Sequence, residues 1–121
     1  MPDEYQLRFY KNSQTGREPL SEYLASIDEK SRSKIGKYVE YLRLCEGYLD
    51  EPYFRHITGK IRELRVDFSH NHYRIFYFTF IGKTIILLHG FTKKTAKTPD
   101  NEIKKALENY NDTISNPQLY E

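Results

Sequence analysis

The chain has 121 residues, of which 38% are hydrophobic and 30% are charged, with a formal net charge of +2 at pH 7. This length suits one domain and is too short for two independent cores, and no apolar run approaches the ~18 residues that a membrane span requires. A single cysteine excludes an internal disulfide framework and a cysteine-based zinc site, and since the start of the chain lacks a signal-peptide pattern, we expect a cytoplasmic protein with no membrane contact.

The N-terminal part of the chain predicts one strand and then two helices. Apolar and polar residues alternate over residues 5–10, which indicates a strand. After Pro19, apolar residues recur at helical spacing over residues 20–27, and the same spacing predicts a second helix over residues 29–46 that ends before Gly47. Because so few residues separate the two helices, we expect them to form a helical hairpin.

The rest of the chain predicts a loop over residues 50–59, three strands and a final helix. The strand-like runs cover residues 61–68, 72–80 and 83–92, with turns at 69–71 and 81–82. Ile85–Leu88 is apolar at every position, as in a strand covered on both faces. Thr98 followed by Pro99 has the pattern of a helix start with Thr98 as the N-cap, and residues 115–121 show no periodicity, which predicts a loose C-terminal tail.

These elements follow the order β-α-α-β-β-β-α, which is typical of an α+β fold. We expect a single domain over residues 1–114. In this domain a mainly antiparallel sheet packs against the N-terminal helical hairpin, and a C-terminal helix completes the fold. No linker, repeat or low-complexity tract interrupts this range.

The charge is distributed unevenly along the chain. Residues 1–54 sum to −2, residues 55–97 to +7 and residues 98–121 to −3, and all four histidines fall in the basic central stretch. A basic centre of this kind favours a surface that binds a polyanion, for which nucleic acid is the first candidate. The alternative is a solvated face that is rich in lysine for no functional reason.

Two arginines stand out because they lie within apolar strands. Burying an unpaired guanidinium is costly, so Arg65 and Arg74 need partners. Either they pair with Glu63 and Asp67, or they line a cleft that binds an anion, and the residues alone leave both interpretations open.

Lysines gather in the loop after the last strand, at Lys93, Lys94 and Lys97, just before a predicted helix N-terminus. This is a natural place to bind phosphate, although a solvated turn has the same composition. Aromatic residues near this charge, such as Tyr73 and Phe91, are candidates for stacking on bases, although most aromatic side chains must form the core.

Other chemistry has little support in the sequence. His70 and His72 lack a third clear metal ligand, so we expect no metal and no cofactor. His89 lies in an apolar strand, where a buried, hydrogen-bonded histidine and a functional one are equally consistent with the pattern. Neither a glycine-rich phosphate loop nor a serine nucleophile motif is present in the sequence.

Four segments together resemble the RelE/HigB superfamily, in its phage-derived, HigB-like subgroup. The resemblance spans roughly residues 5–112. The segments are Ile61-Arg-Glu-Leu-Arg65, Tyr73-Arg-Ile-Phe-Tyr77, Leu87-Leu-His-Gly-Phe-Thr-Lys-Lys94, and Thr98-Pro99 with Glu102-Ile103. Members of this superfamily are toxins of type II toxin–antitoxin systems, and the order of elements predicted above is similar to theirs.

The resemblance implies an endoribonuclease that cuts messenger RNA in the ribosomal A site and so stops translation. It also implies a helix-turn-helix antitoxin, HigA-like, that neutralises the toxin, with a heterotetramer as one expected assembly. The residues that match the recurrent motif are Arg62, Glu63, Arg65, Tyr73, Arg74, Tyr77, Phe91, Lys93 and Lys94, and Lys60, Lys97 and His89 join them as further candidates from the basic central stretch. We expect Arg65, Arg74, Lys93, Lys94, Glu63 and Tyr77 to serve catalysis, and Arg62, Lys60, Tyr73, Phe91, Lys97 and His89 to bind RNA.

RNA cleavage through its own 2′-hydroxyl needs proton removal, stabilisation of a phosphorane and protonation of the leaving 5′-oxygen. Arg65 and Arg74 suit the phosphate because guanidinium groups bind its oxygens in pairs and stay charged. Lys93 or Lys94 adds charge or transfers a proton, Glu63 is an alternative base, and Tyr77 is a proton donor or a stacking partner. No metal is required for this chemistry.

Two other functions remain open at this stage. One is a toxin of the same fold that poisons DNA gyrase by binding, as ParE-like relatives do. The other is a non-catalytic module that binds RNA or a protein partner. A gyrase poison would need no catalytic basic cluster, and an inert module would not arrest growth, so induced expression separates the three hypotheses.

Overall fold

A mixed sheet forms the centre of the computed structural model, which describes residues 4–80 and 82–121. Within these residues, five strands have the order β1-β5-β4-β3-β2. The strands are β1 (Gln6–Phe9), β2 (Phe54–Thr58), β3 (Ile61–Phe68), β4 (Asn71–Phe80) and β5 (Thr84–Lys93). The helices are α1 (Pro19–Ser26), α2 (Glu29–Leu44) and α3 (Asp100–Ser115), followed by a 3-10 turn, η1 (Pro117–Tyr120). The predicted turn at 81–82 includes Ile81, which lies outside the described residues.

The α+β class and the mostly antiparallel sheet are confirmed, but the predicted order of elements is wrong in detail. β1 runs parallel to β5 and the other neighbouring strands are antiparallel. β2 forms within the stretch expected to be a loop. It is an edge strand that pairs only with β3, and a bulge interrupts this pairing between His56 and Thr58. All five of its side chains are half-buried or exposed. An edge strand of this kind needs no regular alternation of apolar residues, which is why the sequence pattern did not predict it.

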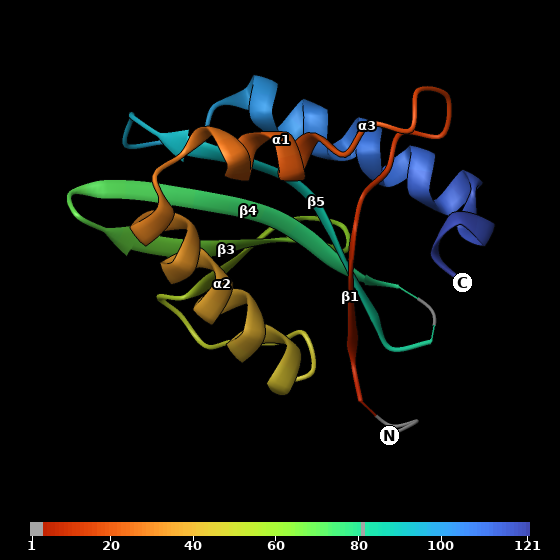
Figure 1. Cartoon of the computed structure of the whole chain (residues 1–121), viewed down its shortest axis with the longest axis horizontal. Coiled ribbons are helices and arrows are strands. Elements are labelled where there is room, and N and C mark those ends of the chain that lie inside the picture. Colours follow the sequence, from red (N-terminus) through yellow and green to blue (C-terminus); the bar gives the residue numbers. More distant parts are fainter. Residues whose placement is uncertain (1–3, 81) are drawn as a thin grey trace.

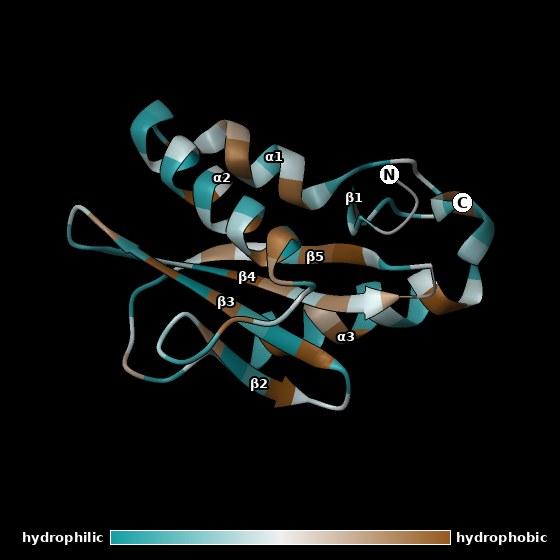
Figure 2. Cartoon of the chain, turned by 90° about the horizontal axis from the view of Figure 1, so that it is seen from below, coloured by the Kyte–Doolittle hydropathy of each residue, from teal (hydrophilic) through white to brown (hydrophobic). Residues whose placement is uncertain are grey.

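Two apolar cores cover the two faces of the sheet. Figure 2 shows α1 and α2 on one side, the α1/α2 face, and α3 on the other, the α3 face. Leu64, Ile75 and Leu87 belong to the core under α1 and α2. Phe78 and Leu88 belong to the core under α3. β5 lies between β1 and β4 with apolar packing on both sides, which confirms the interpretation of its all-apolar run.

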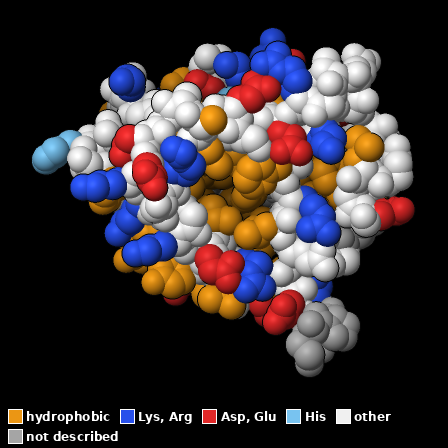
Figure 3. Space-filling view, viewed as in Figure 1, with side chains coloured by type: hydrophobic (Ala, Val, Ile, Leu, Met, Phe, Trp, Pro, Cys, Tyr) orange, Lys and Arg blue, Asp and Glu red, His pale blue; other side chains and the backbone are white. Residues whose placement is uncertain are grey.

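The two N-terminal helices do not form the expected hairpin. α1 lies across β5 and α2 lies across β3, so each helix packs on the sheet (Figure 1). The apolar stripes explain this arrangement, because Leu20 of α1 and Ile35 and Leu42 of α2 are all buried in the same sheet core. Figure 3 shows that this face is hollowed between α1, α2 and β1, with hydrophobic side chains at the bottom.

The C-terminal segment is packed, in contrast to the expected loose tail. Tyr120 is buried, and its hydroxyl accepts a hydrogen bond from the backbone N–H of Lys11 at 2.9 Å and donates one to the carbonyl of Lys11 at 3.2 Å.

The start of α3 also differs from the prediction. Pro99 is the N-cap residue, and the Thr98 side chain turns toward β3. None of the helices in the described part of the chain is long and apolar enough to cross a membrane.

We predict that alanine at Gly90 of β5 destabilises the fold, because α1 approaches the sheet closely there. A Cβ at this position would lie 2.6 Å from Leu20 Cδ1 and 2.9 Å from Ile75 Cδ1. Both side chains are buried and have no solvent to move into. The free energy of unfolding, measured in urea, should fall by about 1–3 kcal/mol.

The matched control is Gly36→Ala in α2. A Cβ there meets nothing within 4 Å, so the gain in helix propensity should raise stability by about 0.5–1 kcal/mol. Equal effects of the two substitutions would contradict the close packing of α1 on β5.

Candidate functional site

On the α3 face of the sheet, polar side chains lie beyond the apolar core, in rows that cross the strands. Arg65 of β3 lies opposite Arg74 of β4, which lies opposite Phe91 of β5. In the next row His72 of β4 lies opposite Lys93 of β5. Directly opposed residues in antiparallel strands point to the same face. The sheet therefore brings Arg65, Arg74 and Lys93 together, and we call these three residues the arginine–lysine cluster.

A bulge in β5 decides that Lys93 belongs to this face. Ile86 and Leu88 pack in the core under α3, so strict alternation would send Lys93 to the opposite face. The register shifts by one residue next to Phe76 and Tyr77, so that Phe76 pairs with His89 and Tyr77 pairs with Leu87. The shift changes the phase of the strand and places Phe91 and Lys93 beside Arg74.

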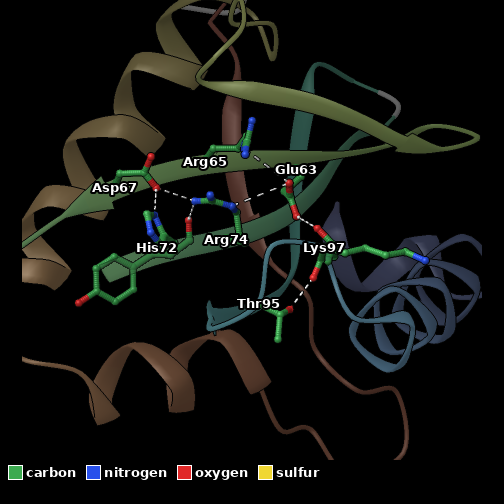
Figure 4. Close-up of polar contacts among 9 residues, drawn as sticks. Glu63, Arg65, Asp67, His72, Arg74, Thr95 and Lys97 are labelled. Carbon is green, nitrogen blue, oxygen red and sulfur yellow. Dashed lines mark hydrogen bonds and ion pairs between the residues drawn. The ribbon is translucent and has the colours of Figure 1, made fainter. Parts of the chain in front are cut away.

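Glu63 is fully buried between the two arginines of the cluster (Figure 4). Its Oε1 lies 3.9 Å from Arg65 Nε and 4.0 Å from Arg74 Nε. The hydroxyl of Thr98 donates a hydrogen bond of 3.1 Å to the other carboxylate oxygen. Oε1 and the two Nε atoms make no hydrogen bond and are buried, so this carboxylate acts on the arginines through charge.

Arg74 is held from a second side by Asp67. Its Nη1 donates 2.9 Å hydrogen bonds to Asp67 Oδ1 and to the carbonyl of Tyr73. The His72 ring lies 2.9 Å from the same Asp67 oxygen. Burial alone would raise the pKa of Asp67, but the hydrogen bonds with His72 and Arg74 outweigh it and lower the pKa. The pairing of the two arginines with Glu63 and Asp67 is therefore confirmed, and the binding of an anion by the same arginines stays a prediction.

Lys93 is the least compensated charge of the cluster. The residue is only 7% exposed, and no ion pair to it is found among residues 4–80 and 82–121. Burial lowers the pKa of Lys93, and the neighbouring Arg74, Arg65 and Arg55 lower it further, while Glu63 opposes them. A lysine in such surroundings gives up its proton more readily than a lysine in water.

Three rings lie side by side next to the cluster. Phe91 stacks with Phe76 at 5.6 Å between ring centroids and with His89 at 6.1 Å. His89 Nε2 is 2.6 Å from a carboxylate oxygen of Glu102 in α3. His89 is therefore a partly buried, hydrogen-bonded histidine that ties β5 to α3, and Phe91 is the ring nearest to Arg74 along the strand pairing.

Several residues expected at the site lie elsewhere. Tyr73 and Tyr77 belong to the core under α1 and α2, where their hydroxyls donate to Ser31 Oγ and to the Gly47 carbonyl. Burial raises the pKa of Tyr77 to about 12. Arg62 also alternates away from the cluster, and its guanidinium lies 6.0 Å from the Tyr48 ring. The physical reason is the two-residue period of a strand, which puts neighbours on opposite faces.

The remaining lysines are exposed and outside the cluster. Lys60 lies in the turn between β2 and β3, and Lys94 in the loop after β5. Lys97 follows in the same loop, and its side chain points away from Arg74 (Figure 4).

Sequence reasoning missed three contributors to the site. The local sequence around Thr98 predicts an N-cap. Nothing in it indicates a hydrogen bond to Glu63, which is 35 residues away in the chain. His72 stands beside Asp67 only because β3 and β4 pair in this register. Arg55 lies directly opposite Glu63, on a strand that was expected to be a loop. Among the described residues, no group of three or more histidines, cysteines or acids lies close enough to hold a metal ion.

Comparisons with known proteins identify a matching family and two similar curated proteins. It matches the family described as phage-derived Gp49-like proteins over residues 22–111. Two curated relatives, each described as a probable endoribonuclease HigB1, come from Mycobacterium tuberculosis strains CDC 1551 / Oshkosh and ATCC 25618 / H37Rv. Each is 29% identical to this chain over 101 residues, which are 84% of this chain and 78% of the relative.

We predict that Lys93→Met stabilises the fold, by about 1 kcal/mol, because it replaces a desolvated charge beside two arginines with an apolar side chain of similar length. The unfolded chain holds the Lys93 proton more tightly than the folded chain, since folding lowers the pKa. The stability of the wild type should therefore rise with pH between that lowered pKa and the ordinary value of 10.5.

The advantage of Lys93→Met should accordingly be largest at neutral pH and shrink toward pH 10.5. Urea unfolding at neutral and alkaline pH measures this. Lys94→Met, which removes an exposed charge from the next residue, serves as the control and should change stability little. A variant less stable than the wild type at neutral pH would contradict the unfavourable placement of Lys93.

Proposed function

The chain belongs to the phage-derived Gp49-like family, in agreement with its resemblance to HigB-like toxins, and we propose that it is the toxin of a type II toxin–antitoxin system that cuts messenger RNA. The observation that carries this proposal is the convergence of Arg65, Arg74 and Lys93 on one sheet face around a buried carboxylate. Three cations at one place suit a reaction in which a phosphate gains negative charge. The relatives described as probable endoribonucleases support the same reaction.

The proposed reaction is attack of an RNA 2′-hydroxyl on the adjacent phosphorus, with departure of the 5′-oxygen of the next nucleotide. Arg65, whose side chain is partly exposed, binds a non-bridging oxygen, and the buried Arg74 adds its charge from beneath, so that both stabilise the phosphorane. The products are a 2′,3′-cyclic phosphate and a new 5′-hydroxyl. Since the nucleophile belongs to the RNA and the charge is met by side chains, we propose that the reaction requires no metal.

Lys93 is our candidate for proton transfer, because burial and the charges of Arg74, Arg65 and Arg55 lower its pKa and bring it closer to neutral pH. Lys94 is exposed in the loop after β5, and we assign it added positive charge near the site. Glu63 is fully buried and cannot touch the RNA in this structure. We therefore assign Glu63 to positioning: it holds the two guanidinium groups side by side, and the Thr98 hydroxyl holds Glu63.

The ribosome and an antitoxin are the proposed partners. A site with few proton-transfer groups benefits from an RNA strand that is already oriented. Correct orientation of the reacting groups can lower the activation barrier by ~7–11 kcal/mol. We propose that the messenger RNA is cut on the ribosome for this reason, in the cytoplasm. A HigA-like helix-turn-helix antitoxin would neutralise the toxin, and a heterotetramer is the proposed assembly.

The test compares Arg65→Ala with Arg62→Ala in induced bacteria. Both substitutions remove one arginine from β3, but only Arg65 points to the cluster. The wild type and Arg62→Ala should arrest growth and produce new 5′ ends inside reading frames, which disappear when translation is blocked. Arg65→Ala should lower the yield of these ends by about a hundredfold, the cost of losing one group that stabilises the transition state.

Three outcomes would contradict the proposal or part of it. Full toxicity of Arg65→Ala would overturn the assignment of the arginine–lysine cluster as the active site. Growth arrest with DNA damage and without new RNA ends would indicate a gyrase poison instead. Wild-type expression without arrest would indicate a non-catalytic module.

We also predict that Tyr77→Phe keeps growth arrest and RNA cleavage, because the Tyr77 hydroxyl lies on the α1/α2 face and donates to Gly47. Its loss should lower the free energy of unfolding by about 1 kcal/mol, since the Gly47 carbonyl loses a buried partner. Thermal unfolding and the growth assay together measure this. Loss of cleavage with unchanged stability would return Tyr77 to the catalytic residues.

A further inference from the structure

A basic pocket lies between β2 and the start of α3, beside the arginine–lysine cluster. Its volume is about 160 Å³, and it is lined by Arg55, His56, Ile57, Lys97, Thr98 and Ile103. None of these residues has a role in the reaction described above except Thr98, which holds Glu63 from the other side.

The pocket combines unpaired positive charge with an apolar wall. Arg55 and Lys97 are exposed, and within residues 4–80 and 82–121 no ion pair involves either side chain. Ile57 and Ile103 belong to the edge of the core under α3. A backbone phosphate with its ribose has matching chemistry, since the phosphate needs cations and the sugar ring tolerates an apolar contact.

The pocket lies next to the cluster. Thr98 is a wall of the pocket and donates to Glu63, which lies between Arg65 and Arg74. Arg55 is directly opposite Glu63 in the β2–β3 pairing and so points to the same face. Arg55 is also close enough to Lys93 to lower its pKa. Lys97 extends away from Arg74 (Figure 4) and lines the pocket together with Ile103 of α3, so the positive charge continues past Thr98.

We propose that the pocket holding Arg55 and Lys97 binds the backbone phosphate next to the one that is cut, and so fixes the path of single-stranded RNA from the cluster across Thr98 to the start of α3. This inference rests on the proposed function. It assigns Arg55 and Lys97 to substrate binding and leaves the chemical step to the cluster. The contact is to phosphate and ribose, so it carries no base preference.

The test measures binding of a short single-stranded RNA with 2′-fluoro riboses, which lack the attacking hydroxyl. Fluorescence anisotropy gives Kd at several KCl concentrations for the full-length protein. The double variant Arg55→Gln/Lys97→Gln should bind more weakly at low salt. The slope of log Kd against log salt should fall by about 0.7, as expected when the protein neutralises one phosphate fewer on a single strand.

The matched control is Lys30→Gln/Lys37→Gln, which removes two exposed charges from α2 on the other side of the sheet. It should keep the wild-type slope. A slope lowered equally by both double variants would show only a general effect of net charge and would overturn the pocket as a specific subsite.

Arg65→Ala separates failure of the pocket from failure of the cluster, because Arg65 is the partly exposed arginine beside Glu63. If Arg65→Ala weakens binding and Arg55→Gln/Lys97→Gln does not, the pocket is overturned as a subsite while the cluster keeps its role. If both bind like the wild type, the pocket is overturned and phosphate binding by the cluster with it, whereas the growth and 5′-end assay described above decides the proposed function independently.

Discussion

The buried carboxylate of Glu63 is the constraint on which the rest of the structure depends. A fully buried acid must be compensated within the protein, because removing its charge from water costs several kcal/mol. Arg65, Arg74 and Thr98 provide this compensation from β3, β4 and the loop before α3. One side chain therefore links three segments and fixes where two guanidinium groups stand.

This compensation is incomplete. The Glu63 carboxylate lies about 4 Å from both arginines without a hydrogen bond to either. Its Oε1 and the Nε atoms of Arg65 and Arg74 are therefore buried without a hydrogen bond. Lys93 adds a third cation with no ion pair among the described residues. Such an arrangement costs stability, and in the proposed function a bound phosphate would offset the repulsion among these cations.

The two faces of the sheet separate packing from chemistry. On the α1/α2 face, tyrosines and aliphatic side chains form a core that holds both N-terminal helices. On the α3 face, α3 covers one end of the strands, and the other end carries the charged rows. The bulge in β5 moves Phe91 and Lys93 onto the charged end, so one irregular residue in a regular strand completes the cluster.

The sequence by itself determined the elements whose signal is local: the helical spacing of α1 and α2, the apolar run of β5, the start of α3 near Pro99, and the prominence of Arg65 and Arg74 in apolar strands. Only the tertiary structure decided which faces meet. Strand β2, the pairing of Asp67 with His72, the contact of Thr98 with Glu63 and the opposite orientation of Tyr77 all depend on partners distant in the chain. The physical reason is that register and bulges set the phase of a strand, and a shift of one residue exchanges the two faces.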